Sequence, residues 1–120
     1  MQKRQFKTLK IWDKGHKLTL DVYRITAKFP QSEAYAIVSQ LRRAASSVPA
    51  NIAEGCVKSK LVFLNHLSIA QGSLEEVKYF LILGHDLDYI SRIEFEELSE
   101  KCEELGKMIY SFIIKLKADS

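Results

Sequence analysis

Cysteine, proline and glycine are scarce in this chain of 120 residues, which contains two cysteines, two prolines and five glycines. Cys56 and Cys102 stand alone, without a Cys-x-x-Cys spacing or a neighbouring histidine, so neither a metal site nor a redox pair is indicated. We expect both to be reduced thiols that behave as small hydrophobic residues. The few glycines form no phosphate-binding loop. The composition, 47% hydrophobic and 28% charged, is instead typical of a folded, helix-rich globule.

Long hydrophobic runs are also missing, since none is longer than the five residues YFLIL at 79–83. The basic N-terminal segment MQKRQFKTLK is followed by no apolar stretch. We therefore expect neither a secretory signal nor a membrane span, and a cytoplasmic protein. A chain of this length fits one domain, residues 1–120, with a single core.

Apolar residues recur at alternating spacings of three and four, which predicts amphipathic helices at about 8–28, 32–55, 59–89 and 91–117. Four long helices joined by short connections favour an all-α fold, an antiparallel up-down-up-down four-helix bundle. No strand-like alternation competes with this prediction.

Local residues mark where these helices start and stop. Pro30 ends the first helix, because the residue before a proline is displaced from helical geometry. Ser32 is a candidate N-cap for the second helix, and Gly55 offers its end. Ser91 and Glu94 have the spacing of a capping box at the start of the fourth.

Pro49 lies inside the helical pattern of the second segment. A proline in a helix interior removes one hydrogen bond and clashes with the carbonyl four residues earlier, here that of Ala45, at a cost of about 3 kcal/mol. We predict a continuous helix kinked at Pro49, with Ser46 or Ser47 helping to satisfy the freed groups. The alternative, a new helix beginning at Pro49, leaves Val48 as a poor N-cap.

A row of polar residues runs beside the apolar face of the second helix. Two interpretations remain open: a solvated face with pairs inside the helix, or a hydrogen-bonded network at a contact with another helix or subunit. In the second case Arg43 and Glu54 need partners elsewhere, because they lie three turns apart. The row consists of Gln40, Arg43, Ser47, Asn51 and Glu54.

The third and fourth helices carry more apolar surface than one bundle core requires. The third is apolar nearly all round at 79–83, and the fourth repeats the excess at 108–110 and 112–114. Either the core is wide with a few exposed apolar residues, or the excess forms an interface between copies of the chain. We expect a homo-oligomer.

Charge is distributed unevenly along the chain. Residues 1–60 contain 12 Lys and Arg against 4 Asp and Glu, whereas residues 61–120 contain 6 against 11. This asymmetry indicates either a surface that meets polyanions or two complementary surfaces that meet each other. Basic residues recur along one edge of the first helix, which suits contacts with phosphates. The candidate nucleic-acid-binding residues are Lys3, Lys7, Lys10, Lys14, Lys17, Arg24 and Lys28, with Arg42 and Arg43 of the second helix.

The sequence lacks the residue patterns of a catalytic bundle. Di-iron bundles need two Glu-x-x-His motifs, and none occurs here. His16, His66 and His85 have neither the spacing of zinc hydrolases nor a nearby nucleophile. We therefore expect no enzymatic activity, no metal or cofactor and no small-molecule substrate.

Several stretches carry a resemblance to a known family: SQLRRAASSVPANIAEG at 39–55, FLNHLSIAQGSLEE at 63–76, and an upstream LKIWDKG element with FPQSEAY. From about Leu9 to Leu116 the chain resembles the four-helix-bundle proteins encoded in intervening sequences of bacterial 23S ribosomal RNA genes. The resemblance implies a homopentamer with no established enzymatic activity. The chain is also similar to the accessory variability proteins of diversity-generating retroelements, basic pentamers that engage a reverse transcriptase and nucleic acid.

The third helix contains further matches to this family. Gly72 and Ser73 occupy the small-residue pair of the family, which we interpret as a site of close helix approach. Glu76 occupies the acidic position that follows, and Arg42 or Arg43 is its candidate partner.

One element departs from the family pattern. After Glu54 and Gly55 the usual arginine is absent and the segment CVKSK stands at 56–60, so any role of that arginine does not transfer.

We expect a non-catalytic, self-assembling bundle that binds RNA or DNA without strong sequence preference, as an accessory to a nucleic-acid enzyme. The alternative is a protein-interaction scaffold with no nucleic-acid role.

Overall fold

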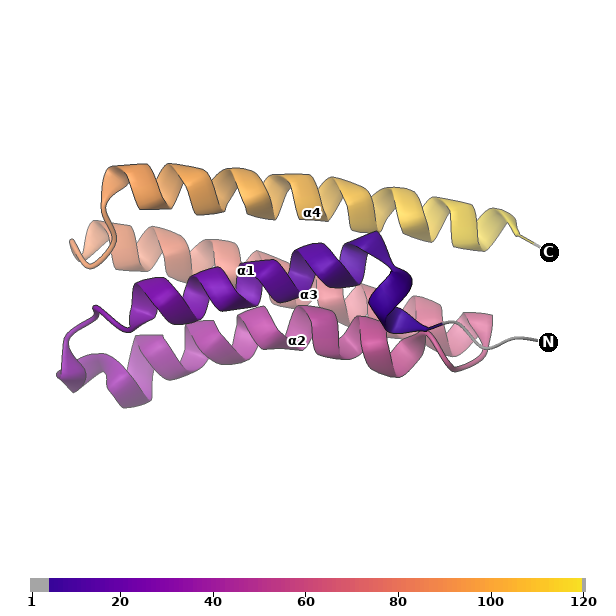
Figure 1. The fold of residues 1–120 in the computed structure, drawn as a ribbon, viewed down its shortest axis with the longest axis horizontal. Coiled ribbons are helices and arrows are strands. Elements are labelled where there is room, and N and C mark those ends of the chain that lie inside the picture. Colours follow the sequence, from indigo (N-terminus) through magenta and orange to yellow (C-terminus); the bar gives the residue numbers. More distant parts are fainter. Residues whose placement is uncertain (1–4, 120) are drawn as a thin grey trace.

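The computed structural model describes residues 5–119, and every regular element in this range is helical. The long helices are α1 Lys10–Thr26, α2 Ser39–Gly55, α3 Lys60–Asp86 and α4 Arg92–Ala118. Consecutive helices run in opposite directions, so the fold is the antiparallel up-down-up-down bundle expected from the sequence (Figure 1). The Cα atoms extend over 49 × 23 × 20 Å. The bundle is therefore a rod, with the start of α1 and the end of α4 at the same end.

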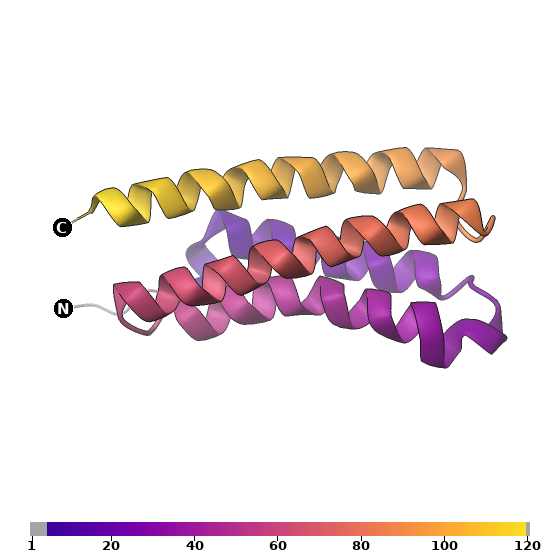
Figure 2. The ribbon, with the colours of Figure 1, turned by 180° about the vertical axis from the view of Figure 1, so that it is seen from behind.

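Helices adjacent in sequence are also adjacent in space. α2 packs against α1 and α3, while α4 packs against α3 and closes the bundle against α1. Seen from behind, α3 and α4 lie side by side with α1 beyond them (Figure 2). Each helix contributes one apolar face to a single core, as the three-four spacing predicts. Its fully buried side chains include Leu18, Val22, Leu41, Val48, Ile52, Phe63, Leu67, Val77, Leu81, Leu105 and Ile109.

The connection between α1 and α2 differs from the prediction. The expected helix at 32–55 begins only at Ser39, after a 3-10 turn, Gln31–Glu33, and a π-helical turn, Ala34–Val38. Ser32 makes no capping hydrogen bond, so its assignment as an N-cap is wrong. The chain turns there through a 3-10 hydrogen bond after Pro30, and Ala36 departs from helical dihedrals with φ −118° and ψ −106°.

The end of α3 also comes earlier than predicted. The helix ends at Asp86 because Asp88 adopts a left-handed conformation, with φ 63°, that closes it. The capping box of α4 is confirmed: the Glu94 N–H donates to Ser91 Oγ at 3.1 Å, and the Ser91 N–H donates to Glu94 Oε1 at 3.4 Å. The start of α4 is therefore fixed by its own sequence.

Helix α2 continues through Pro49, and its ribbon bows along its length (Figure 1). The Ala45 carbonyl, which Pro49 leaves without a partner inside the helix, lies 3.1 Å from the hydroxyl of Thr19 on α1. The same hydroxyl lies 2.9 Å from the Gly15 carbonyl oxygen. A Cβ atom on Gly15 would lie 3.4 Å from Pro49 Cδ, so α1 comes close enough for Thr19 to reach. Compensation for the proline therefore comes from the neighbouring helix.

The serines expected to perform this task have other partners. Ser46 Oγ donates to the Arg43 carbonyl at 3.2 Å, and Ser47 Oγ is hydrogen-bonded to Ser73 Oγ at 2.8 Å. The assignment of Ser46 or Ser47 to the freed carbonyl is therefore wrong, because only Thr19 faces it from across the helix interface.

Candidate nucleic-acid interface

Two lysines of the predicted α1 stripe meet carboxylates of α4. Lys14 Nζ lies 3.2 Å from Glu104 Oε1, and Lys28 pairs with Glu94. The basic first half of the chain thus packs against the acidic second half. For these residues the structure favours the interpretation of two complementary surfaces that meet each other.

Two further basic residues of the stripe are paired within α1. Lys17 Nζ lies 2.9 Å from Asp13 Oδ2, and Arg24 Nη1 lies 2.7 Å from Asp21 Oδ1. Lys7 and Lys10 make no ion pair with any residue in 5–119. Lys3 lies outside the described residues. Only the beginning of the predicted stripe therefore retains cations that no carboxylate of the described chain neutralises.

Asp21 is the most buried carboxylate at the α1–α4 contact, where Lys101 Nζ also approaches it at 2.7 Å. Burial acts to raise the pKa of Asp21, but the hydrogen bonds and charges of Lys101 and Arg24 outweigh it, so this pKa is lowered. The hydrogen bond from Lys28 lowers the pKa of Glu94, and the hydrogen bonds from Ser91 add to this effect. Both carboxylates stay ionised at neutral pH and hold α1 to α4.

The two candidate arginines of α2 are engaged within the bundle. Arg42 is half-buried, with its guanidinium 4.4 Å from the centre of the Tyr23 ring, and its Nε donates to Thr26 Oγ1 at 2.9 Å. Arg43 Nη2 donates to Gln40 Oε1 at 2.8 Å and pairs with Glu76 at 2.7 Å. Of the two partners that the sequence left open for Glu76, the structure selects Arg43.

The polar row of α2 joins α2 to α3 within this chain. Asn51 Nδ2 donates to the Ser47 carbonyl at 2.9 Å and lies 3.1 Å from the Ser47 hydroxyl, which meets Ser73 on α3. His66 Nδ1 lies 2.9 Å from Asn51 Oδ1, so this nitrogen carries the proton, since a carbonyl oxygen only accepts. Glu54 Oε2 is 3.9 Å from the same nitrogen. The row acts as a structural network and leaves these groups satisfied.

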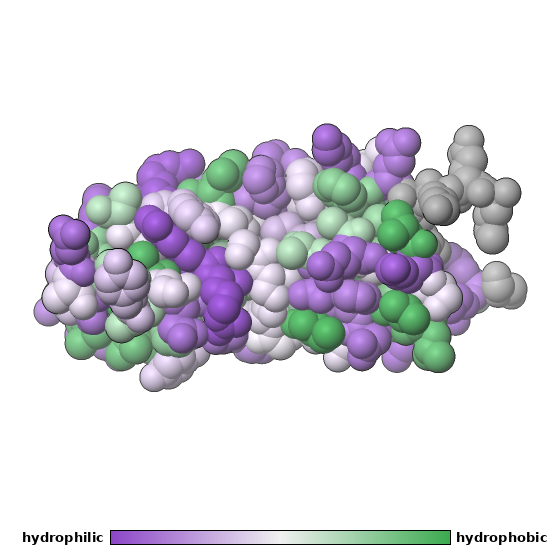
Figure 3. Space-filling model, turned by 90° about the horizontal axis from the view of Figure 1, so that it is seen from below, coloured by the Kyte–Doolittle hydropathy of each residue, from purple (hydrophilic) through white to green (hydrophobic). Residues whose placement is uncertain are grey.

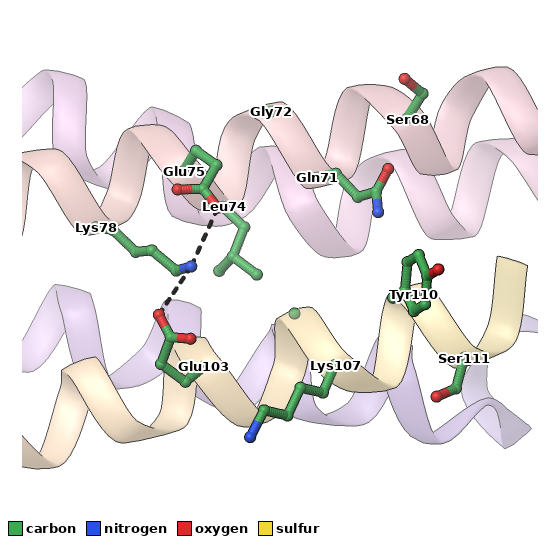
Figure 4. A pocket seen from close by; sticks show the side chains of 11 residues that line it. Ser68, Gln71, Gly72, Leu74, Glu75, Lys78, Glu103, Lys107, Tyr110 and Ser111 are labelled. Carbon is green, nitrogen blue, oxygen red and sulfur yellow. Dashed lines mark hydrogen bonds and ion pairs between the residues drawn. The ribbon is translucent and has the colours of Figure 1, made fainter.

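Gly72 does not serve the purpose that the sequence suggested. A Cβ atom there would have nothing within 4 Å, so the expectation of close helix approach is wrong for Gly72 within this chain. Its neighbour Ser73 does reach α2, with its hydroxyl oxygen 2.8 Å from that of Ser47. The close approach of α2 and α3 is at Gly55, where a Cβ atom would lie 2.7 Å from His66 Cβ and 2.9 Å from Phe63 Cδ1. Gly72 instead faces outward, along an open groove between α3 and α4 (Figure 4).

The α3–α4 groove has a volume of about 800 Å³. Lys78 lies across it, with Nζ 3.1 Å from Glu75 and 2.9 Å from Glu103 (Figure 4). The hydrogen bond with Glu103 raises the pKa of Lys78. The surplus apolar surface expected from the sequence lies on these two helices, where the exposed hydrophobic residues include Leu61, Ile69, Tyr79, Ile82, Tyr110 and Ile114.

Unneutralised lysines gather at one end of the rod. If the bundle is divided at the midpoints of its helices, near residues 18, 47, 73 and 105, the half containing the start of α1 has nine Lys and Arg against three Asp and Glu, counted over 5–119. The other half has seven against twelve. Hydrophobic residues lie among hydrophilic ones toward the same end (Figure 3). Within 5–119 the lysines of this end that make neither an ion pair nor a side-chain hydrogen bond are Lys7, Lys10, Lys58, Lys107, Lys115 and Lys117, called the lysine-rich end below. Lys60, at the same end, donates to the Asp119 carbonyl.

Sequence reasoning missed four of the six lysines of this surface, since only Lys7 and Lys10 were among the predicted residues. Lys107, Lys115 and Lys117 belong to the acidic half of the sequence. They join Lys7 and Lys10 because an even number of antiparallel helices returns the chain to its starting end.

A model of the family described as 23S rRNA-intervening sequence protein matches residues 7–111. The chain belongs to this family. Among solved structures it is similar to a protein of unknown function from the S23 ribosomal protein family of Bacteroides thetaiotaomicron VPI-5482, with a TM-score of 0.76 and 26% identity. That match covers 86% of this chain and 97% of the other. No match is found among the curated proteins. The resemblance inferred from the motifs is therefore confirmed.

Two other findings bear on this member of the family. No helix within 5–119 is long and apolar enough to cross a membrane. In the same range, no three histidine, cysteine or acidic side chains gather as they do around a metal ion. The charged groups of the described chain are instead arranged in pairs along the helices and in the lysine-rich end.

Proposed function

We propose that this protein is a non-catalytic, self-associating cytoplasmic bundle that binds RNA or DNA through its lysine-rich end. The observation that carries the proposal is the segregation of charge along the rod. Phosphates bind clustered lysines because counterions are released from the nucleic acid. The acidic end repels the same phosphates, so a strand contacts one end only. Its role is that of an accessory to a nucleic-acid enzyme.

The proposed surface replaces most of the α1 stripe. Lys7 and Lys10 belong to both surfaces, whereas Lys14, Lys17 and Lys28 are held by carboxylates of their own chain. A phosphate that bound these three lysines would have to displace those carboxylates. Lysines make point-charge contacts without reading base edges, so sequence preference is small.

We also propose that copies of the chain associate through the α3–α4 face, in the pentamer that the family resemblance implies. Association would bury the exposed apolar residues of this face and so be favourable. A second chain could pack closely at Gly72, because no atom of this chain lies within 4 Å of the position of a Cβ atom there. Symmetry would multiply the lysine-rich end and strengthen its hold on a polyanion.

The nucleic-acid proposal is tested with two matched triple variants. Lys107→Gln, Lys115→Gln and Lys117→Gln together remove three charges from the lysine-rich end, while Lys14→Gln, Lys17→Gln and Lys28→Gln remove three from paired positions. Fluorescence anisotropy at low salt should show strong loss of binding in the first variant and little in the second. The slope of log affinity against log salt should fall by about two for single strands in the first variant. Equal losses, or no binding by the unmodified chain, contradict the proposal.

The second candidate function is a protein-interaction scaffold with no nucleic-acid role. It is favoured by the ion pairs that join α1 to α4, which account for part of the charge asymmetry within one subunit. Light scattering separates the two candidates. A scaffold keeps a discrete oligomeric mass that an RNA of about 30 nucleotides leaves unchanged at low salt, whereas the first proposal requires uptake of the RNA.

A further inference from the structure

A second groove opens at the lysine-rich end, between the start of α1 and the last turns of α4. Its volume is about 450 Å³, within the usual range of small-ligand sites. It has an apolar floor and a polar rim. The floor consists of Leu9, Ile11, Met108 and Phe112, and the rim of Thr8, Lys10, Lys107, Ser111 and Lys115.

The floor is held in place by the core. Phe112 is half-buried, and its ring meets the buried ring of Phe63 edge-on, with the centroids 5.6 Å apart. Ile11 is buried, and Met108 packs against the same core. One side of this apolar layer is therefore rigid, while its other side faces the groove.

The rim carries positive charge, and none of its lysines makes an ion pair within residues 5–119. Lys107 and Lys115 lie eight residues apart on α4, about 12 Å along the helix, and Lys10 faces them from α1. The carboxylates one turn before Lys107 have nearer partners, since Glu103 pairs with Lys78 and Glu104 pairs with Lys14. The charge of Lys107 is only a smaller contribution to the lowered pKa of Glu103, after the hydrogen bond and charge of Lys78.

Hydroxyl groups complete the rim. Thr8 Oγ1 donates to the Gln5 carbonyl at 2.8 Å, so its oxygen remains an acceptor for a ligand N–H. Ser111 adds a second hydroxyl from α4. The groove thus combines an apolar surface, polar groups that can orient a heterocycle, and cations on both sides.

We propose that this groove takes an unpaired nucleobase of single-stranded RNA or DNA, with the flanking phosphates on Lys10, Lys107 and Lys115. The inference rests on the proposed function and names its substrate class. A base has apolar faces and carries a phosphate on either side, which matches an apolar floor between cationic rims. In a duplex the bases are stacked and paired, so a duplex reaches the lysines but leaves the floor uncovered.

Photocrosslinking tests this placement directly. Single-stranded and hairpin-duplex oligonucleotides of equal length, each with one 5-iodouracil, are irradiated with the full chain at low salt. Trypsin cleaves after Lys107 and Lys115 and so releases this wall of the groove as the peptide 108–115. We expect the single strand to crosslink to that peptide and the duplex not to. If the oligonucleotides crosslink only to other peptides, the inference is overturned while the proposed function stands. If neither the single strand nor the duplex binds the protein, the inference and the proposed function are both overturned.

A floor variant gives a second, independent measurement. Met108→Ser removes apolar surface without changing charge, and should weaken binding of the single strand about tenfold while leaving duplex binding unchanged. Met108→Leu keeps the floor apolar and should retain affinity. Ile93→Ser alters an exposed apolar residue at the far end of α4 and serves as the control. Equal circular dichroism spectra and melting temperatures show that the fold is intact. Equal loss for single strand and duplex, or no loss for either, overturns the inference.

Discussion

A Cβ atom on Gly55 would lie 2.7 Å from the Cβ atom of His66, nearer than two side chains approach in a folded protein. The last turn of α2 therefore touches α3 directly. This contact holds the His66 ring at Asn51 and aligns the polar network that ends at Ser73. The packing of α2 on α3 depends on the absence of one side chain.

Replacement of this glycine by alanine should destabilise the fold. Gly55→Ala forces α2 and α3 apart or displaces Phe63, and we expect a loss of about 1–3 kcal/mol in the free energy of unfolding. Gly72→Ala is the matched control, because it meets nothing within 4 Å and gains about 0.5–1 kcal/mol from helix propensity. Urea denaturation of both variants at low protein concentration measures the difference. If the free energy of unfolding changed in the same direction in both variants, the assignment of Gly55 as the crowded glycine and Gly72 as the open one would be contradicted.

The hydroxyl of Thr19 should matter because Pro49 is present. Thr19→Val leaves the buried Ala45 carbonyl without a donor, and we expect a loss of about 1–3 kcal/mol. In a Pro49→Ala background the new N–H donates to that carbonyl, so the same substitution should cost less. A double-mutant cycle by thermal or urea denaturation measures the coupling. Independent, additive costs would show that Thr19 does not compensate for the proline.

Asp21 should make the stability depend on acid. Because its folded-state pKa is lowered, its contribution is present above the ordinary value of 3.8 and is lost as the pH falls through the lower folded value. Asp21→Asn should therefore melt at a lower temperature than the unmodified chain at neutral pH, and the gap should close on acidification below pH 3.8. Calorimetric melting curves of both proteins test this. A gap independent of pH would contradict the ion pairs with Lys101 and Arg24.

Cys102 should be inert in the folded protein. Burial raises its pKa to about 12, so almost no reactive thiolate is present near neutral pH. Iodoacetamide at about pH 8 should leave Cys102 unmodified in the native chain and alkylate it after denaturation. Mass spectrometry of tryptic peptides distinguishes the two states. Rapid alkylation without denaturant would show that the core opens at this position.

Local patterns were sufficient to predict the helices, the core face of each helix and the capping box at Ser91. They failed where the outcome depends on neighbours distant in sequence. Ser32 has the chemistry of an N-cap, yet the segment after Pro30 forms tighter turns first. Gly72 and Gly55 look alike in the sequence, and only the rotation of α2 against α3 decides which of them is crowded.

The candidate nucleic-acid interface was also only partly predictable, because it depends on residues that are distant in the sequence. The spacing of basic residues along α1 was visible in the sequence, but their partners were not, because Glu94 follows Lys28 by 66 residues and Glu104 follows Lys14 by 90. The three α4 lysines of the lysine-rich end belong to a sequence half with net negative charge. Their grouping with Lys7 and Lys10 follows from topology, which the composition of either half does not reveal.

The uneven charge also makes the bundle an electric dipole along its long axis. Neighbouring dipoles attract when they are antiparallel and repel when they are parallel, and salt screens both effects. Added salt should therefore weaken an antiparallel assembly and strengthen a parallel one. In a ring with every lysine-rich end on the same face, assembly and nucleic-acid binding would respond to salt in opposite directions. A bound strand would take the place of salt, drawing together the subunits whose lysines it neutralises.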